Sequence, residues 1–393
     1  MRVSPQDPVT LAEFAALMAA LAPHDPARQV VAGISGGADS MALALLLRQW
    51  GDPLAVVIDH GLRPEAAAEA AITIARLQAL GIKTRLVSLT LQKGPDLGAR
   101  ARTARYEALL AVCHVSGRPD LLIAHHAQDN AETVQIRAVS GSGPIGLAGI
   151  APIAWRADAR VLRPLLEIHP ARLRATLNQV GLSWVEDPTN QDPATARGAL
   201  RMAASPPRPM PTPSALRAAL ERAVATELAA RATLFPTGHA AIAAPLGPDA
   251  WSALLWTLSG QPYPPSRAAV ARLARAGQGT LHGVHVAAGL ATREPAAMAP
   301  TIPARRGARW DGRFVLGRDI PGATIGALGP DAARLRRRPG LPSVVLRTLP
   351  ALRIGTDLLA VPHLAYPDAE TCRSVAVEFR PTRPLAGLSF AIP

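Results

Sequence analysis

The first half of the chain alternates between short apolar runs and longer stretches with the spacing of helices. The apolar runs predict four strands, at residues 29–34, 54–58, 84–89 and 120–124. The stretches with helical spacing are residues 11–22, 39–50, 64–80, 97–113, 128–139 and 170–180. Strands that alternate with helices of this length predict an α/β domain, in which helices cover both faces of a parallel, twisted sheet.

The second half has a different pattern, which begins with five prolines between residues 206 and 213. Such proline density forbids helix and favours a stiff linker. A helix is predicted over residues 214–234, with one buried face formed by Leu216, Leu220, Val224 and Leu228. Two more helical stretches follow, at 251–259 and 266–276. From residue 279 short apolar runs alternate with Gly and Pro, which predicts a β-rich region.

These patterns predict four parts of the chain. They are an α/β domain at 1–204, a linker at 205–213, a helical region at 214–278 and a β-rich domain at 279–393.

Charge separates the two halves further. The net charge is +13, and 40 of the 42 basic residues are Arg. Residues 1–200 carry 19 basic and 18 acidic side chains, whereas the rest carries 23 and 11. High-GC coding would explain the shortage of Lys but not this asymmetry. Because Arg pairs bidentately with phosphate, the basic half predicts a module that docks onto nucleic acid.

Several classes of protein do not fit the sequence. No apolar stretch reaches the roughly 18 residues that a membrane span needs, and residues 1–7 lack the features of a secretion signal. We therefore expect a cytoplasmic protein with no membrane contact. Cys113 and Cys372 are far apart and form no zinc or disulfide pattern, so both are expected to be small buried residues.

The strongest chemical signal lies between the first strand and its helix. It consists of Ser35, Gly36, Gly37, Ala38, Asp39 and Ser40. Adjacent glycines let backbone amides approach an anion, and the start of a helix adds free N–H groups. Asp39 would repel phosphate unless a cation lay between them, so it indicates Mg²⁺. The alternative is a plain turn whose Ser and Asp cap the helix.

Two more polar motifs follow strands. Asp59, His60 and Arg63 come after the second strand, where His60 and Arg63 could reach adenine or phosphates. The alternative for this motif is a polar turn. Ligands of parallel sheets bind at these carboxyl ends of the strands.

The third motif, at residues 125–133, follows the fourth strand. Side chains alternate along a strand, so His125 and His126 are not expected to chelate a metal together. Asp129 and Glu132 share one face of the next helix, which suits an ammonium group or, alternatively, a solvated acidic surface.

With these residues in view, a family resemblance can be stated. The loop at 35–40 resembles the pyrophosphate loop of the N-type ATP pyrophosphatases, which lacks the Lys of a Walker loop. The chain resembles the tRNA(Ile)-lysidine synthetases over residues 28–201, about half its length. Other matching segments are 59–63, 101–106, 125–133, 141–143, 146–147, 163–166 and 184–190, and, more loosely, 309–314 and 361–363.

The resemblance implies a ligase that uses ATP and Mg²⁺. Its substrates would be free L-lysine and the isoleucine tRNA with a CAU anticodon, and its products lysidine, AMP and pyrophosphate. By position, the residues at 35–40 and Asp59, His60 and Arg63 would bind ATP, with Asp39 also holding Mg²⁺. Asp129 and Glu132 would bind lysine. Arg102 would act in catalysis, and the tRNA contacts would be Arg105, Arg163 and Arg201. The oligomeric state is left open, a homodimer included.

This sequence departs from the family pattern at five positions, namely Gly98, Gln128, Asn130, Ser140 and Gly198. None of these positions falls in the loop at 35–40. Three alternatives stay open. They are a tRNA thiolase, which would need reactive cysteines, an amidoligase, which would not need a basic second half, and an inactive RNA-binding paralogue.

Overall fold

The computed structural model divides the chain into two compact units, residues 1–219 and 220–393. It describes residues 4, 6–21, 24, 27, 29–61, 65–91, 94–95, 97–156, 159–186, 213–335, 340–383 and 385. Most of the predicted proline-rich linker lies outside these residues, and the division between the units falls inside helix α9 (Pro213–Arg231). Within the described part of the chain, no helix combines the length and apolar character needed to cross a bilayer.

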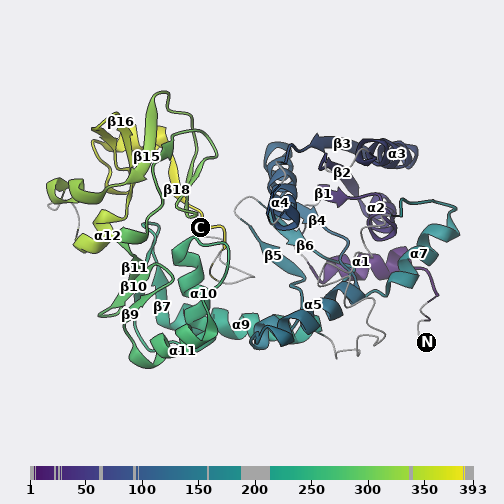
Figure 1. Ribbon diagram of the computed structural model, residues 1–393, viewed down its shortest axis with the longest axis horizontal. Coiled ribbons are helices and arrows are strands. Elements are labelled where there is room, and N and C mark those ends of the chain that lie inside the picture. The colour runs from purple at the N-terminus through teal and green to yellow at the C-terminus, as the bar shows by residue number, and fades with distance from the viewer. Residues whose placement is uncertain are drawn as a thin grey trace. The chain divides into compact units, whose positions relative to one another are not determined.

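The first unit is built on a six-stranded sheet (Figure 1). The strands are β1 (Gln29–Ile34), β2 (Asp52–Asp59), β3 (Lys83–Ser88), β4 (Asp120–Leu122), β5 (Ile153–Trp155) and β6 (Arg160–Leu162). Their order is β3-β2-β1-β4-β6-β5, and every neighbouring pair is parallel except β5 and β6. Central strands such as β1 are nearly continuous apolar runs because both faces of the sheet are covered.

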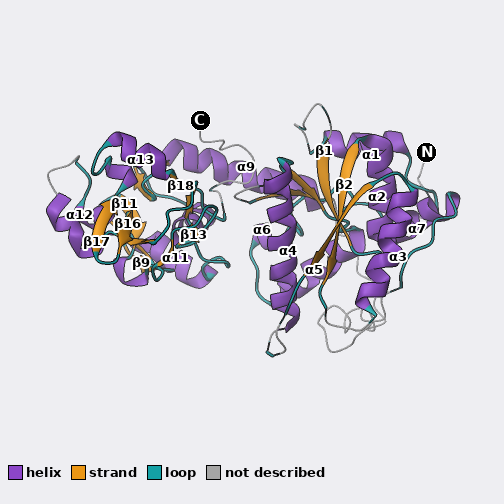
Figure 2. Cartoon of the chain, turned by 90° about the horizontal axis from the view of Figure 1, so that it is seen from above, coloured by secondary structure: helices purple, strands orange, loops and turns teal. Residues whose placement is uncertain are grey.

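Helices cover both faces of this sheet (Figure 2). The helices are α1 (Leu11–Ala19), α2 (Ala38–Trp50), α3 (Ala66–Ala79), α4 (Leu97–Ser116), α5 (Ala127–Val139), α6 (Pro144–Leu147) and α7 (Pro170–Gln179). One core joins the sheet to α1, α2, α3 and α7, and a second core joins the opposite face to α4. Ten of the thirteen residues of α2 are buried, so its N-terminus is held rigidly at the carboxyl end of β1.

The second unit contains three antiparallel sheets. The first has the order β7-β8-β11-β10-β9 and packs on three helices, α9, α10 and α11. The second has the order β12-β15-β16-β17, and the third has the order β13-β14-β18. The strands are β7 (Ala232–Leu234), β8 (His239–Ile242), β9 (Gly279–Leu281), β10 (Val284–Ala287), β11 (Leu290–Arg293), β12 (Ile302–Pro303), β13 (Arg309–Trp310), β14 (Phe314–Leu316), β15 (Ala323–Ala327), β16 (Pro350–Ile354), β17 (Asp357–Ala360) and β18 (Val377–Phe379). The helices are α10 (Pro248–Ser259), α11 (Arg267–Ala276), α12 (Ser343–Arg347) and α13 (Ala369–Val375), with short 3₁₀ turns η2 (Pro295–Ala297), η3 (Gly329–Leu335) and η4 (Pro362–Leu364).

The predicted fold class is confirmed, with three local corrections. The sheet is not wholly parallel, because β5 is an antiparallel edge strand and neither β5 nor β6 was predicted. The helix predicted at 214–234 ends at Arg231, since Ala232–Leu234 pairs with β8. Leu216 was predicted to be buried but is 55% exposed, so the buried face of α9 lies further along, where Val224 and Leu228 contact the core.

Candidate active site

The Gly-rich loop joins the carboxyl end of β1 to the first turn of α2. Gly36 has φ +90°, and a Cβ there would lie 2.3 Å from the Thr73 hydroxyl oxygen of α3. The backbone N–H of Val185 donates to the Gly36 carbonyl at 2.9 Å, which fixes the loop from a second side. Gly37 is the N-cap of α2 and makes no side-chain cap bond. The first-turn amides of α2 therefore suit an anion such as phosphate.

Two serine hydroxyls hold the loop together. The Ser40 hydroxyl donates to the Gly37 carbonyl at 2.9 Å and accepts from the Ser35 N–H at 3.2 Å. The two hydroxyl oxygens are also 3.2 Å apart. Both serines were predicted to donate to phosphate. Because the Ser40 proton goes to Gly37, the Ser35 hydroxyl is the donor in the contact between the two serines, so the backbone amides are the better donors for a bound anion.

Replacing Gly36 with Ala is expected to lower the free energy of unfolding by about 1–3 kcal/mol from backbone strain alone. The overlap with Thr73 adds to this loss, so nucleotide affinity should fall as well. Gly98→Ala is the matched control, because Gly98 lies in α4 and a Cβ there meets nothing within 4 Å. That change introduces no overlap, so the free energy of unfolding should stay close to that of the wild type. Denaturant unfolding of both variants tests the expectation, and equal effects would contradict it.

Three polar side chains from two helices converge beside this loop. The Nε2 of His126 lies 3.4 Å from Oδ2 of Asp39 and 3.6 Å from Oδ2 of Asp129. Asp39 is in the first turn of α2, and Asp129 in the first turn of α5. The structure therefore brings the loop at 35–40 and the motif at 125–133 together at the carboxyl edge of the sheet. This was predicted from the position of each motif at the end of a strand.

The acidic residues of α5 are buried rather than solvated. Asp129 and Glu132 are 9% and 1% exposed, so a solvated acidic surface does not describe them. Asp129 Oδ2 accepts from the backbone N–H of His126 at 3.1 Å, and Glu132 Oε1 accepts from the Gln128 amide at 3.3 Å. Buried carboxylates are costly unless they are paired. A cationic amine at this helix face would be a further favourable partner for these carboxylates.

The two adjacent histidines have different partners. The prediction that they would not chelate together assumed a strand, but β4 ends at Leu122 and both residues lie in the following connection. His125 Nδ1 accepts from Arg163 Nε at 3.0 Å, whereas His126 caps α5. The role of His126 was missed. Its signal was an acceptor side chain followed three residues later by Asp129, which is a capping-box spacing.

Asp39 fits a metal ion that arrives with a nucleotide. Its Oδ1 is buried and has no hydrogen-bond partner among the described residues. The same residues contain no group of three or more His, Cys, Asp or Glu side chains that could hold a metal by themselves. Mg²⁺ is usually bound by one or two carboxylates together with water and substrate phosphates. A single carboxylate oxygen without a hydrogen-bond partner among the described residues is consistent with that mode of binding.

The second motif supplies a neutral histidine at the end of β2. Burial and the nearby guanidinium of Arg105 lower the pKa of His60, and the Asp59 carboxylate opposes them only in part. Asp59 Oδ1 accepts from the Gly61 N–H at 2.9 Å, which tightens the turn. A neutral imidazole can accept or donate one hydrogen bond to an adenine edge. Arg63, predicted to join it, lies outside the described residues.

Helix α4 contributes arginines around Tyr106. Arg102 and Arg105 place their guanidinium carbons 5.3 Å and 5.7 Å from the centre of the Tyr106 ring. Burial raises the pKa of Tyr106, but the charges of Arg163, Arg102 and Arg105 outweigh burial and lower it. Tyr106 was not singled out from the sequence, although it follows Arg102 at the i+4 spacing of one helix face.

Arg163 is an interior residue. It is 7% exposed, its Nε donates to His125, and its Nη1 donates to the Ala151 carbonyl at 2.8 Å. Burial lowers its pKa. The prediction that it contacts tRNA is therefore not carried forward, since little of its guanidinium surface can reach a phosphate. Arg201 lies outside the described residues.

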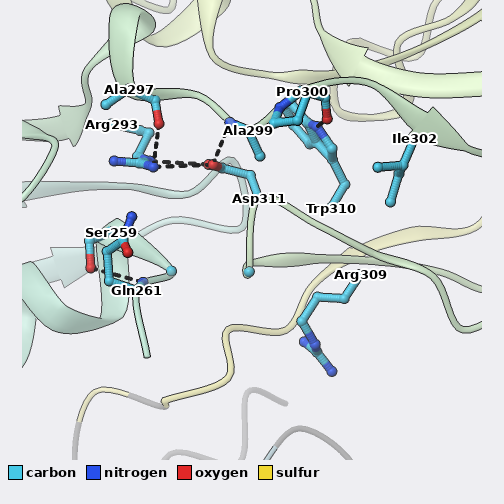
Figure 3. Close-up of a pocket in the computed structure, with 12 residues that line it drawn as sticks. Ser259, Gln261, Arg293, Ala297, Ala299, Pro300, Ile302, Arg309, Trp310 and Asp311 are labelled. Carbon is cyan, nitrogen blue, oxygen red and sulfur yellow. Dashed lines mark hydrogen bonds and ion pairs between the residues drawn. The ribbon is translucent and has the colours of Figure 1, made fainter. Parts of the chain in front are cut away.

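The motif at 309–314 forms the interior of the second unit. Asp311 has φ +52° and accepts from two buried guanidiniums, Arg293 Nε at 3.2 Å and Arg313 Nε at 2.9 Å. Figure 3 shows Arg293 and Asp311 facing each other. Both residues line a cavity of about 350 Å³. Trp310 contributes to the lining and donates to the Pro300 carbonyl at 3.2 Å. The motif is therefore chiefly structural.

The loop, the parallel sheet and the site at the ends of its strands define a class of nucleotide-binding protein. Residues 10–207 match the family model of the PP-loop domain. That match covers half of the 393 residues, so the chain belongs to the PP-loop domain family.

Curated relatives carry the name tRNA(Ile)-lysidine synthase. One from Bradyrhizobium sp. (strain BTAi1) is 39% identical over 202 residues, which cover 49% of this chain and 56% of the relative. One from Methylobacterium nodulans is 44% identical over 180 residues, which cover 44% and 52%. One from Thermus thermophilus is 39% identical over 204 residues, which cover 50% and 38%. The matched part thus spans about half the length of these relatives or less.

Among solved structures, the chain is similar to the U34-tRNA thiolase NcsA from Methanococcus maripaludis. The TM-score is 0.43 and the sequence identity 16%, over 53% of this chain and 77% of that one.

Proposed function

We propose that the chain is an ATP-dependent ligase that joins free L-lysine to C2 of the wobble cytidine of the isoleucine tRNA with a CAU anticodon. One observation carries the proposal, namely that Asp39 of the phosphate loop and Asp129 of α5 converge on His126 within 3.4 and 3.6 Å. The names of the relatives supply the substrates, and the residues of this chain supply the chemistry.

The proposed reaction has two steps. The C2 oxygen of cytidine attacks the α-phosphorus of ATP, and pyrophosphate leaves. The ε-amine of lysine then attacks C2, the C2–oxygen bond breaks, and AMP leaves with that oxygen. Adenylation is needed because it turns a poor leaving oxygen into a good one.

Different residues of the first unit are proposed to bind the different substrates of this reaction. The amides at the start of α2 and the Ser35 hydroxyl would bind the phosphates, and Asp39 would hold Mg²⁺, which would supply positive charge to neutralise the developing pyrophosphate. Asp129 and Glu132 bind the lysine ammonium, and a carboxylate there can take the proton that the amine loses. Positioning two substrates in this way accounts for a large part of a rate enhancement.

The basic second half is proposed to dock the tRNA. Beyond residue 200 the chain carries 23 basic and 11 acidic side chains, as expected for contacts with a phosphate backbone. In the first unit, Arg102 is exposed on α4 and Arg105 is half-buried, so both are proposed to meet phosphates, and Arg201 is proposed as a tRNA contact by its position in the sequence. With these substrates, we also propose a cytoplasmic location for the enzyme.

A thiolase is not favoured. Both cysteines are buried, and Cys113 packs in the core between the sheet and α4. Neither is in the loop or at the start of α5, where a sulfur nucleophile would have to act.

The test is mass analysis of nucleosides from isoleucine tRNA incubated with the protein, ATP and isotope-labelled lysine. We expect a cytidine that has gained lysine with loss of one water. A tRNA with uridine at the wobble position is the matched control and should remain unmodified. ATP consumption without a lysine-bearing nucleoside would refute the proposal.

A further inference from the structure

His126 occupies the junction between the phosphate loop and the start of α5. Its side chain is 7% exposed, and Nε2 lies 3.4 Å from Asp39 Oδ2 and 3.6 Å from Asp129 Oδ2. On its other side, Nδ1 accepts from the backbone N–H of Asp129 at 3.4 Å and so caps the helix. One imidazole therefore touches two helices that carry different parts of the site.

The hydrogen bond that caps α5 determines which ring nitrogen of His126 carries the proton. A ring nitrogen that accepts a hydrogen bond carries no proton, so in the neutral ring the proton is on Nε2. That proton faces the Asp39 and Asp129 carboxylates. Oδ2 of Asp39 lies 3.4 Å from Nε2, whereas Oδ1 of the same carboxylate has no hydrogen-bond partner among the described residues. His126 is therefore placed against one oxygen of Asp39, and the other oxygen is the one available to a cation.

We infer that His126 is a positioning residue, which fixes the metal-binding carboxylate of the phosphate loop relative to the amine-binding carboxylate of α5. The inference rests on the proposed function. It adds a physical link between the two half-reactions, because the nucleotide is held from α2 and the lysine from α5. A displacement of about 1 Å between reacting groups can reduce a rate about a hundredfold, so the spacing between these two helices has to be fixed.

The experiment replaces His126 with Asn. Asn is a favourable N-cap, so the start of α5 keeps an acceptor, but the shorter side chain loses the reach to Asp39. The matched control is His169→Asn, because His169 caps α7 in the same manner, through Nδ1 and the Ala171 N–H at 3.2 Å. His169 has no carboxylate within ion-pair distance among the described residues.

Three quantities are measured on each full-length variant. They are the apparent Kd of Mg²⁺ in the presence of a non-hydrolysable ATP analogue, the KM of lysine and the midpoint of thermal unfolding. His126→Asn should raise both the Kd and the KM by about tenfold, in the range found when a partner of a metal ligand is removed. The unfolding midpoint should stay close to that of the wild type. His169→Asn should leave the Kd and the KM unchanged.

The outcomes separate this inference from the proposed function. If the wild type itself does not bind Mg²⁺ with the analogue, the proposed function fails. If the wild type binds Mg²⁺ and His126→Asn has the same Kd and KM as the wild type, only the positioning role is refuted. If only one of the two constants changes, His126 does not link the metal-binding and amine-binding carboxylates. Imidazole ¹⁵N shifts of the wild type add a measurement that does not depend on a folded variant. A proton on Nε2 is expected at His126, and a proton on Nδ1 would overturn the inference.

Discussion

Replacing Asp39 with Asn is expected to reduce pyrophosphate release by about a hundredfold or more, while tRNA affinity changes little. The reason is that Asp39 Oδ1 is a buried carboxylate oxygen of the loop with no hydrogen-bond partner among the described residues. An amide oxygen in its place carries no charge to hold Mg²⁺. A bound metal ion stabilises a phosphoryl transition state by several kcal/mol, and each 1.36 kcal/mol corresponds to about tenfold in rate.

The measurement is ATP–pyrophosphate exchange in the presence of tRNA, combined with tRNA binding by filter retention. Asp357→Asn is the control, since Asp357 is an exposed residue at the start of β17. It should behave as the wild type in both assays. Undiminished exchange by Asp39→Asn would remove the metal-binding role from this residue.

The largest effect on stability is expected for Asp311→Asn. The substitution leaves Arg293 and Arg313, which are 2% and 0% exposed, without their shared counter-charge. Breaking a buried ion pair from one side costs about 3–5 kcal/mol. Burial already lowers the pKa of Arg313 to about 10 against the pull of Asp311, so losing the carboxylate should lower it further. Asn tolerates the left-handed backbone at this position, so the loss of stability can be attributed to removal of the negative charge.

Hydrogen exchange of amides in residues 220–393 measures this loss for the second unit alone. The control is Asp331→Asn. Asp331 pairs with Arg353 and Arg334, whose side chains are 19% and 82% exposed. Pairs that reach solvent contribute about 1 kcal/mol or less. Similar losses in the two variants would show that the buried network does not stabilise this unit as argued.

The elements that the sequence predicted well are those with a strong local pattern. Strand β1 and helix α2 are apolar enough to be buried on every side, and their bounds agree with the prediction to within one residue. Strands β5 and β6 have three residues each, too few to show a period, and they exist because they pair with each other and with β4. Leu216 has the spacing of a core residue, but spacing does not reveal where a helix meets its core.

The candidate site, too, was predicted only in part from the sequence. The placement of the loop and of the motifs at strand ends followed from parallel-sheet geometry, which is a general rule. Contacts between side chains that are distant in sequence did not follow. The burial of Arg163 depends on His125, 38 positions away, and the link from His126 to Asp39 depends on two helices meeting at the sheet edge. No local pattern encodes such distances.

The hydrogen bond from Val185 to Gly36 has a consequence for biosynthesis. A ribosome makes the Gly-rich turn long before it reaches residue 185, and β4, the second neighbour of β1, is also made late. The growing polypeptide therefore contains the turn before residue 185 and β4, which hold it in place, have been made. We expect the turn to reach the conformation seen in the folded unit only after residue 185 has been made and has paired with Gly36.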